Sequence, residues 1–329
     1  MIPRILFVYQ GPSPFILQDR DLLAKHAEIR EFRWFDHLHP ARALVKWMFR
    51  HWREYDLVFV WFGDTHATVA IRAAQLLRKP SIIVAGGYDV RDVPDGFLAT
   101  RKGLRRAEGH FRRSTRIVTV SKALQDEVVR RFPGTATKTE VLYLGADVGL
   151  FQPKGPRKRQ VLSVAGAEVW TRAWVKGWDR IAQVAQLLPD VHFLLIGASP
   201  EIARLVDPPA NLEIRGPVRR ADLVTHYQAA AVYLQASRFE ALSSALMEAM
   251  SCGCVPVVTA VGGMPELVGD VGFVVGEDPE MLASAVQKAL DSPERGVRAR
   301  TRIVEQFSLA RREEGLLHIV EDVLARSSS

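Results

Sequence analysis

Two glutamates in the stretch 237–265 are the residues best suited to carry chemistry. Seven residues separate Glu240 from Glu248, and helix-compatible residues fill the second half of that gap and continue to a helix end at Cys252 and Gly253. Carboxylates at these positions would suit the hydroxyls of a sugar and a ribose. Backbone N–H groups at the start of a helix are unpaired and lie at the positive end of its dipole, so they favour phosphate.

The elements that must position these residues alternate between strands and helices. Apolar strand runs precede and follow the stretch, and the same alternation fills the first half of the chain. We expect strands at 4–9, 57–61, 81–85, 117–120, 141–144, 161–165, 192–196, 212–215, 231–235 and 255–258. This pattern is typical of doubly wound α/β folds.

A shift in composition divides the chain into two such domains. Residues 153–159 are proline, glycine, lysine and arginine, which a core cannot bury, so we place a linker at 154–159. The predicted domains are 1–153 and 160–308, both Rossmann-like, and two such domains imply a cleft between them. The C-terminal segment 309–329 carries an amphipathic helix that should dock on another element.

Composition restricts the class of protein. The 329 residues have a formal net charge of +7, with 48% hydrophobic and 25% charged residues. These globular values exclude a disordered or collagen-like chain, and the positive charge suits an anionic partner. Two cysteines, Cys252 and Cys254, make no four-ligand metal site and indicate reduced thiols. With no signal-peptide region or membrane-span run, we expect a soluble cytoplasmic protein.

Two basic segments raise the question of a membrane or nucleic-acid partner. Residues 41–53 form a basic, aromatic helix in which Leu44, Trp47 and Met48 share one face. It would lie either on an anionic membrane at the inner face, with tryptophan at the interface, or on the sheet with its tryptophan packed inside. Residues 101–116 are dense in arginine but lack interleaved aromatics. A solvated helix face explains that run better than nucleic acid, which we do not expect as a partner.

Polar loops in the first half are candidates for a second part of the site. Asp64 and His66 follow one apolar strand, and Gly87 and Asp89 follow the next. Open α/β sheets bind ligands at the carboxyl ends of their strands, although His66 would equally suit a helix start that only caps or packs. The loop after the first strand lacks G-x-G-x-x-G, which argues against a nicotinamide dehydrogenase.

The order of these motifs resembles the retaining GT-B glycosyltransferases of family 4 (glycosyl transferase group 1). The resemblance covers most of residues 80–280, with a weaker match over the first strand. The matching motifs are Val120-Ser121-Lys122, Gly145-Ala146-Asp147, Lys176-Gly177, Asn211 to Val218, Ser237 to Glu240, Glu248-Ala249-Met250, Gly253 to Val258 and Gly262 to Glu266.

That resemblance implies transfer of a hexose-type sugar from a nucleotide-diphosphate-sugar to an acceptor hydroxyl, with retained anomeric configuration and no metal or other cofactor. Glu240 would lie beside the donor sugar, Lys176 would neutralise the leaving diphosphate, and Glu248 would accept hydrogen bonds from the ribose. The remaining donor-binding positions would be Leu242, Ser243 and Ser244 for the diphosphate, Gly216 and Val218 for the base, and Gly11 from the other domain. The resemblance also implies that the last helix packs on the first domain.

The chain departs from the family pattern in three places. An arginine expected after the first glycine of the second domain is missing, since the run is Gly166-Ala167-Glu168, and Arg172 is our candidate replacement. The first loop has one glycine, Gly11, where relatives have two. A histidine expected before the first-domain Gly-x-Asp is absent, and His66 and Asp89 are our stand-ins for its role in catalysis.

The first hypothesis is a transferase that uses a UDP- or GDP-sugar and acts on a glycan, lipid-linked or small-molecule acceptor. Two other classes of function remain open at this stage. One is a nucleotide-sugar epimerase of GT-B architecture, which needs no acceptor. The other is a non-catalytic protein that binds nucleotide-sugars or polyanions, which the positive charge and the atypical first loop favour. Trp170, Trp174 and Trp178 recur at helical spacing, and we interpret them as a core stripe in preference to a sugar-stacking platform.

Overall fold

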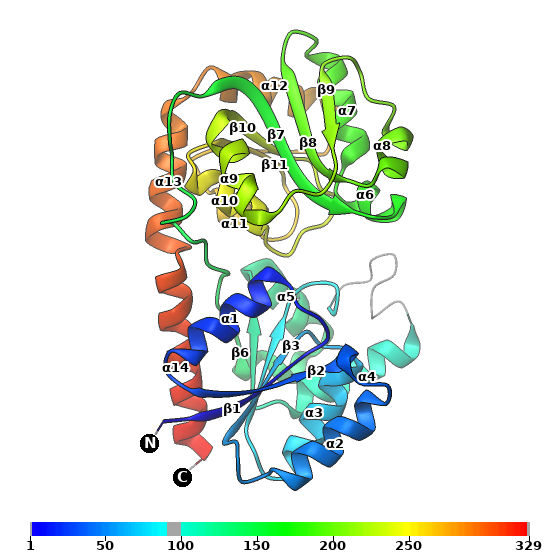
Figure 1. Ribbon diagram of the computed structural model, residues 1–329, viewed down its shortest axis with the longest axis vertical. Coiled ribbons are helices and arrows are strands. Elements are labelled where there is room, and N and C mark those ends of the chain that lie inside the picture. The colour runs from blue at the N-terminus through cyan, green and yellow to red at the C-terminus, as the bar shows by residue number, and fades with distance from the viewer. Residues whose placement is uncertain (1, 91–99, 328–329) are drawn as a thin grey trace. The chain divides into compact units, whose positions relative to one another are not determined.

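The computed structural model describes residues 2–90 and 100–327, which form two compact α/β units (Figure 1). The first unit comprises residues 1–143 together with 310–329, and the second comprises residues 144–309. Each contains a six-stranded sheet in which every strand pairs in parallel with its neighbours. Each unit is described by itself below.

The sheet of the first unit has the strand order β2-β1-β3-β4-β5-β6. Its central strands are continuous apolar runs that are buried along their length, as expected for a parallel sheet covered on both faces. The strands are β1 (Arg4–Tyr9), β2 (Glu28–Arg33), β3 (Leu57–Trp61), β4 (Ser81–Ala85), β5 (Arg116–Thr119) and β6 (Thr139–Val141).

Helices connect these strands, and several begin at residues suited to a helix start. Ser121 accepts a hydrogen bond from the N–H of Leu124, and Pro14 and Pro40 stand in first turns, where a missing N–H costs nothing. The helices are α1 (Pro14–Ala24), η1 (Trp34–Asp36), α2 (Pro40–Arg50), α3 (Thr65–Leu76), α4 (Arg101–Arg113), α5 (Lys122–Arg131), η3 (Pro133–Lys138) and α14 (Leu309–Ser327). Helices α2, α3 and α4 pack side by side.

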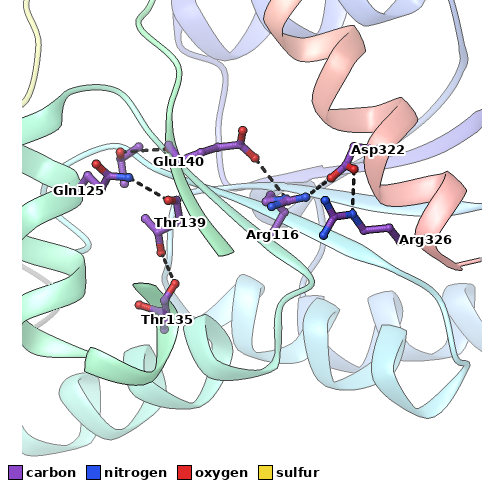
Figure 2. Close-up of polar contacts among 8 residues, drawn as sticks. Arg116, Gln125, Thr135, Thr139, Glu140, Asp322 and Arg326 are labelled. Atoms are coloured by element: carbon purple, nitrogen blue, oxygen red, sulfur yellow. Dashed lines mark hydrogen bonds and ion pairs between the residues drawn. The ribbon is translucent and has the colours of Figure 1, made fainter. Parts of the chain in front are cut away.

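Helix α14 belongs to the first unit although it ends the chain. Arg312 donates to both carboxylate oxygens of Asp19 on α1 at 2.9 and 2.6 Å, and neither side chain is exposed by more than 1%. Near the other end of α14, Asp322 pairs with Arg116, which also pairs with Glu140 at 3.2 Å (Figure 2). Because losing one partner of a buried ion pair costs about 3–5 kcal/mol, Arg312 fixes α14 to this unit.

The sheet of the second unit has the order β12-β11-β10-β7-β8-β9, so β7, the first strand, lies at its centre. Helices α7 and α12 pack together on it, as do α9, α10 and α13. The strands are β7 (Lys158–Ala167), β8 (His192–Ala198), β9 (Leu212–Arg215), β10 (Ala230–Gln235), β11 (Val255–Thr259) and β12 (Phe273–Val275). The helices are α6 (Trp170–Val175), α7 (Trp178–Leu187), α8 (Pro200–Val206), α9 (Arg220–Ala229), α10 (Ser244–Ser251), α11 (Met264–Val268), α12 (Pro279–Leu290) and α13 (Glu294–Gln306).

The segment predicted as a linker is bound to the second unit. The second unit begins at Leu144, ten residues before the predicted linker at 154–159, and Lys158 and Arg159 already belong to β7. Arg157 donates to the carbonyl oxygen of Ala230 at 2.5 Å and also to that of Cys252. A basic residue in this stretch therefore does not stay in solvent, because backbone carbonyls at the end of α10 and the start of β10 pair with it.

Candidate functional site

Glu240 and Lys176 form an ion pair at the carboxyl end of β10. The Nζ of Lys176 lies 2.5 Å from Oε2 of Glu240, and the two side chains are exposed by 22% and 13%. Oε2 also accepts a hydrogen bond of 2.9 Å from Nε2 of Gln235, the last residue of β10. In a sheet of order 3-2-1-4-5-6, ligands bind outside the carboxyl ends of the two central strands, here β7 and β10. The pair occupies that position.

Two glycines hold the backbone on either side of this pair. Gly177, directly after Lys176, has a φ of +74°, and a Cβ there would overlap the carbonyl group of Ala236. Gly262 has a φ of +53°, and a Cβ there would overlap the carbonyl oxygen of Glu240. Only glycine combines this backbone conformation with so close an approach. The Lys176-Gly177 and Gly262-Gly263 motifs thus fix where the two charged side chains start.

Arg238 ties the Glu240 loop to α6 and α7. Its guanidinium makes two hydrogen bonds, of 2.7 and 2.6 Å, to the carboxylate of Asp179 and lies 4.3 Å from the ring centre of Trp174. The three tryptophans predicted as one core stripe are not one: Trp178 is buried, whereas Trp170 and Trp174 are 36% and 42% exposed. The reason is that α6 ends at Val175 and Gly177 breaks the helix.

Glu248 lies on α10 and is only 5% exposed. Its Oε1 accepts a hydrogen bond of 2.7 Å from Nε of Arg220, the first residue of α9. Burial raises the pKa of Glu248, against the opposing effect of the Arg220 guanidinium. A buried carboxylate with one paired oxygen is a suitable acceptor for vicinal hydroxyls, and Arg220 is the group that keeps it in place.

The start of α10 follows directly from the Glu240 loop. Ser243 caps the helix by accepting from the N–H of Leu246 at 3.2 Å, and Leu242 and Ser243 are both buried. The hydroxyl of Ser243 is thus occupied by capping, and Ser244 is the first helical residue. Backbone N–H groups of this turn lie at the positive end of the dipole, within a few residues of Glu240.

Three other predicted residues of the second unit lie at the same sheet edge without touching the ion pair. Arg172 is exposed on α6, and its Nε donates to the carbonyl oxygen of Gly166 at 3.3 Å. Gly216 and Val218 follow β9, and Gly216 is exposed. The structure therefore places Arg172 beside the end of β7. Its carbonyl oxygen accepts from the N–H of Lys176 at 3.0 Å, but among the described residues its guanidinium forms no ion pair with Glu240.

In the first unit, polar side chains meet at the carboxyl ends of β1, β3 and β4. Asp64 Oδ2 accepts from Nε2 of Gln10 at 2.7 Å and from the hydroxyl of Tyr88 at 3.1 Å, while Oδ1 accepts from the N–H of Thr65. Burial acts to raise the pKa of Asp64, but these hydrogen bonds outweigh it and hold the pKa below its usual value. Gln10, Asp64, Thr65 and Tyr88 are all half-buried, and Gly11 adjoins Gln10. We name Gln10, Asp64 and Tyr88 the first-unit polar cluster.

His66, Gly87 and Asp89 are buried, and His66 and Asp89 have no exposed surface. Asp89 accepts from the N–H of Gly63 at 2.7 Å and of Gly87 at 2.8 Å, and burial raises its pKa to about 6. His66 Nε2 lies 2.7 Å from the carbonyl oxygen of Trp61, which fixes the proton on Nε2, and burial lowers its pKa to about 4. Asp89 orders the loop after β4, and His66 anchors the end of β3.

Four residues that contribute to the two sites escaped the sequence analysis. Three of them carry no charge and so did not stand out: Gln10, Tyr88 and Gln235. The fourth, Arg220, lies 28 residues before Glu248, with which it pairs. Gln235 and Gln10 share one recognisable feature, because each is a polar residue that ends or directly follows a buried apolar strand. The Oε1 of Gln235 is buried and has no hydrogen-bond partner among the described residues.

Two family models match the chain, one in each half. A model described as Glycosyltransferase Family 4 matches residues 7–150, and one described as Glycosyl transferases group 1 matches residues 160–292. The chain is 29% identical to alpha-maltose-1-phosphate synthase of Mycolicibacterium smegmatis over 251 residues, 64% of this chain and 63% of that protein. It is 26% identical to MMP alpha-(1->4)-mannosyltransferase of Mycolicibacterium hassiacum over 273 residues, 78% and 62% of the two lengths. It thus spans a little under two thirds of each relative.

Solved structures share the fold. Sucrose-phosphate synthase of Thermosynechococcus elongatus matches with a TM-score of 0.81 at 16% identity, covering 98% of this chain and 100% of that chain. Anabaena Alr3699/HepE in complex with UDP-glucose matches with a TM-score of 0.76 at 19% identity, covering 97% and 99%. The prediction of two Rossmann-like domains of the GT-B type is confirmed.

Proposed function

The chain belongs to the family 4 glycosyltransferases of GT-B fold, and we propose that it transfers a hexose from a nucleotide-diphosphate-sugar to an acceptor hydroxyl, with retention and without a metal ion. The observation that carries this proposal is the Lys176–Glu240 pair at the switch point of the second sheet. A UDP-linked sugar is the first donor to test, because the matching Anabaena structure contains UDP-glucose.

In this proposal the second unit stabilises charge at both ends of the breaking bond. Lys176 and the N–H groups at the start of α10 face the leaving diphosphate, with Arg172 as a further cation. Glu240 faces the sugar ring, where its carboxylate favours positive charge at the anomeric carbon. Glu248 binds the ribose hydroxyls, and the turn at Gly216 and Val218 borders the base. The acceptor oxygen attacks the face that the diphosphate leaves, and its proton passes to a diphosphate oxygen.

The first-unit polar cluster is our proposed acceptor contact, with Gly11 and Gly87 as neighbouring backbone. Asp64 is its only ionised member, and the hydrogen bonds that lower its pKa keep it an acceptor for a sugar hydroxyl. His66 and Asp89 enter this proposal as residues that position the cluster, because both are buried.

The test begins with a thermal-shift panel of UDP- and GDP-sugars, since a ligand that binds the folded state raises its melting temperature. The stabilising donor is then incubated with a panel of acceptors in EDTA and in Mg²⁺, and the product is analysed by NMR. We expect an α-linked product from an α-linked donor at equal rates in both buffers. Conversion of the donor sugar without acceptor would instead establish an epimerase, and donor binding without turnover a binding protein.

A membrane contact of α2 is a separate proposal that concerns where the acceptor is found. Leu44 and Met48 are buried and Trp47 stacks on Tyr55, so the face named from the sequence packs inward. Val45 and Phe49 of α2 and Trp52, which follows the helix, are instead 38–45% exposed, in the same segment as several basic side chains. No helix within the described residues is long and apolar enough to cross a membrane. Co-sedimentation with phosphatidylglycerol vesicles should fall in a Val45→Ser/Phe49→Ser variant if this face binds lipid.

A further inference from the structure

A hollow of about 460 Å³ on the first unit is lined by five basic side chains. Arg72 comes from α3, and Arg101, Lys102, Arg105 and Arg106 come from the first two turns of α4. The opposite side of α4 is buried through Gly103 and Ala107, which lets the two helices pack closely enough to bring the five cations together. The arginine run is therefore more than a solvated helix face, because two elements contribute to one concave surface.

These five cations are not neutralised by acids of the described residues. Arg106 donates to the hydroxyl of Thr65 at 3.2 Å, and none of the five forms an ion pair with a carboxylate in 2–90 or 100–327. The acid on α4, Glu108, pairs with Arg112, one turn further along. Two of these cations, Arg101 and Lys102, lie in the first turn of α4 and oppose its dipole, each at a cost of about 0.3–1 kcal/mol. An anion in the hollow would relieve both the mutual repulsion and the dipole effect.

The hollow adjoins the first-unit polar cluster through a single residue. Thr65, the partner of Arg106, follows Asp64, whose carboxylate accepts from Gln10 and Tyr88. Guanidinium groups bind phosphate through paired hydrogen bonds. We propose that this hollow binds a phosphate or diphosphate group of the acceptor, which places an acceptor hydroxyl at the first-unit polar cluster. The proposal deepens the proposed function, because it assigns a phosphorylated class of acceptor.

The chemistry of the hollow distinguishes this ligand from nucleic acid. Single strands need aromatic side chains on which bases stack, and the lining contains only arginine and lysine. Several cations converging on one hollow suit a compact ligand with two or more negative charges, such as a phosphomonoester or a diphosphate.

The test titrates the full chain with inorganic pyrophosphate at constant ionic strength and follows hydrogen–deuterium exchange in residues 100–113. This readout is local, so pyrophosphate at the donor site near Lys176 does not contribute to it. We expect slower exchange at these amides on binding. Arg101→Gln/Lys102→Gln/Arg105→Gln should raise the half-saturating concentration at least about tenfold, because three charged hydrogen-bond donors are lost.

The matched control Arg112→Gln/Arg113→Gln/Arg130→Gln removes the same charge from exposed positions outside the hollow and should shift the concentration by no more than about twofold. Equal weakening in both variants would show a general charge effect and overturn the proposal, as would unchanged exchange in the wild type. Donor binding and donor hydrolysis, measured on the same variants, report on the proposed function separately. If donor binding and donor hydrolysis were lost while pyrophosphate still bound the hollow, the proposed transferase function would be rejected and the anion site would stand.

A second arm separates the two sources of such a group. Phosphatidylcholine vesicles containing a polyprenyl phosphate and soluble glucose 1-phosphate are each tested for slowing of exchange in residues 100–113. The proposal is supported if either probe slows exchange in the wild type and the control variant but not in the hollow variant. The probe that does so identifies the acceptor as lipid-borne or soluble. Protection by neither probe would overturn an acceptor role for the hollow.

Discussion

The two sheets have similar topologies but different chemistry at their ligand-binding edges. In the second unit, this edge carries two ion pairs, Lys176–Glu240 and Arg220–Glu248, with charged atoms at 2.5 and 2.7 Å. In the first unit, the corresponding edge carries the polar cluster, in which Asp64 is the only charged member, and the fully buried His66 follows Asp64 by two residues.

This contrast fits the tasks we propose for the two edges. A leaving diphosphate and a developing positive charge on the sugar demand fixed charges nearby, and a fixed charge needs a partner while the site is empty. An acceptor hydroxyl demands only hydrogen-bonding groups at defined positions. In the first unit, fixed charges lie beside the edge in the hollow on α3 and α4, where a phosphorylated acceptor would need them.

Removing Lys176 tests this division of tasks most strongly. Lys176→Ala should lower kcat about 100- to 1,000-fold, because stabilisation of charge in the transition state is lost. Arg172→Ala should raise KM for the donor about tenfold if Arg172 is a second diphosphate contact, since a hydrogen bond to a charged group contributes about 1.5–3 kcal/mol. Steady-state kinetics with the identified donor measure both. A Lys176→Ala enzyme of normal kcat would contradict our assignment, and an Arg172→Ala enzyme of normal KM would remove Arg172 from the site.

How far the sequence predicts each site follows from the same contrast. In the second unit, Glu240 and Lys176 each lie beside a glycine with positive φ. Charged residues next to glycines are easy to recognise in a sequence, so this site was predictable. The central strands of both sheets were predictable because they are buried apolar runs, whereas the charged strand β2 and the short strand β12 were not predicted. The pairing of Arg157 was not predictable, because the carbonyls that bind it come from residues far along the chain.

In the first unit, residue type alone misleads. His66 and Asp89 are typical catalytic residues, yet burial turns them into anchors of the loops after β3 and β4. Gln10 and Tyr88 carry no charge, and only the register of β1, β3 and β4 brings them to Asp64. A sequence shows which residues could ionise but not which of them reach solvent.

The role of glycine in the second unit can be isolated by a matched pair of substitutions. Gly177 and Gly155 have φ values of +74° and +71°, but a Cβ on Gly177 would overlap the carbonyl group of Ala236, whereas a Cβ on Gly155 would meet nothing. Gly155→Ala should cost only the strain of the left-handed conformation, about 1–2 kcal/mol of unfolding free energy. Gly177→Ala should cost about 3 kcal/mol or more and also lower kcat, because the loop of Glu240 must move. Equal effects in urea unfolding would mean that backbone proximity is irrelevant here.

Two buried histidines of the first unit, His66 and His110 on α4, predict that this unit is the more sensitive to acid, since burial also lowers the pKa of His110, to about 3. Burial lowers the pKa of His66 to about 4, whereas an unfolded histidine titrates near 6.5. The unfolded chain therefore binds a proton first, and stability is lost as the pH falls from about 6.5 towards 4. Between pH 6.5 and 5, His66 alone should account for about 2 kcal/mol. The raised pKa of Asp89 acts in the opposite direction and offsets part of this loss.

The measurement is urea unfolding at pH 7 and pH 5, monitored by hydrogen exchange in each unit. His66→Gln keeps a donor for the Trp61 carbonyl but cannot take up a proton, so the first unit of this variant should lose less stability on acidification than that of the wild type. His192→Gln, at an exposed position in the second unit, is the control and should change nothing. An acid transition that begins in the second unit would break the comparison.

The smallest effect concerns the first-unit polar cluster itself and separates residues that contact the acceptor from residues that support the loop. Tyr88→Phe removes one hydroxyl that donates to Gln10 and Asp64 at 3.1 Å while keeping the ring beside Phe62. We expect KM for the acceptor to rise about fivefold, the equivalent of about 1 kcal/mol, with donor hydrolysis and stability nearly unchanged. Asp89→Asn is the counterpart, because among the described residues the Asp89 carboxylate accepts hydrogen bonds from the backbone N–H groups of Gly63, Gly86 and Gly87. It should lower stability by about 1–3 kcal/mol and leave acceptor KM within about twofold of the wild type, since Asp89 has no exposed surface that an acceptor could contact. If Asp89→Asn raised acceptor KM more than Tyr88→Phe did, the buried residues would themselves contact the acceptor, and the contrast between the ion pairs of one edge and the polar cluster of the other would fail.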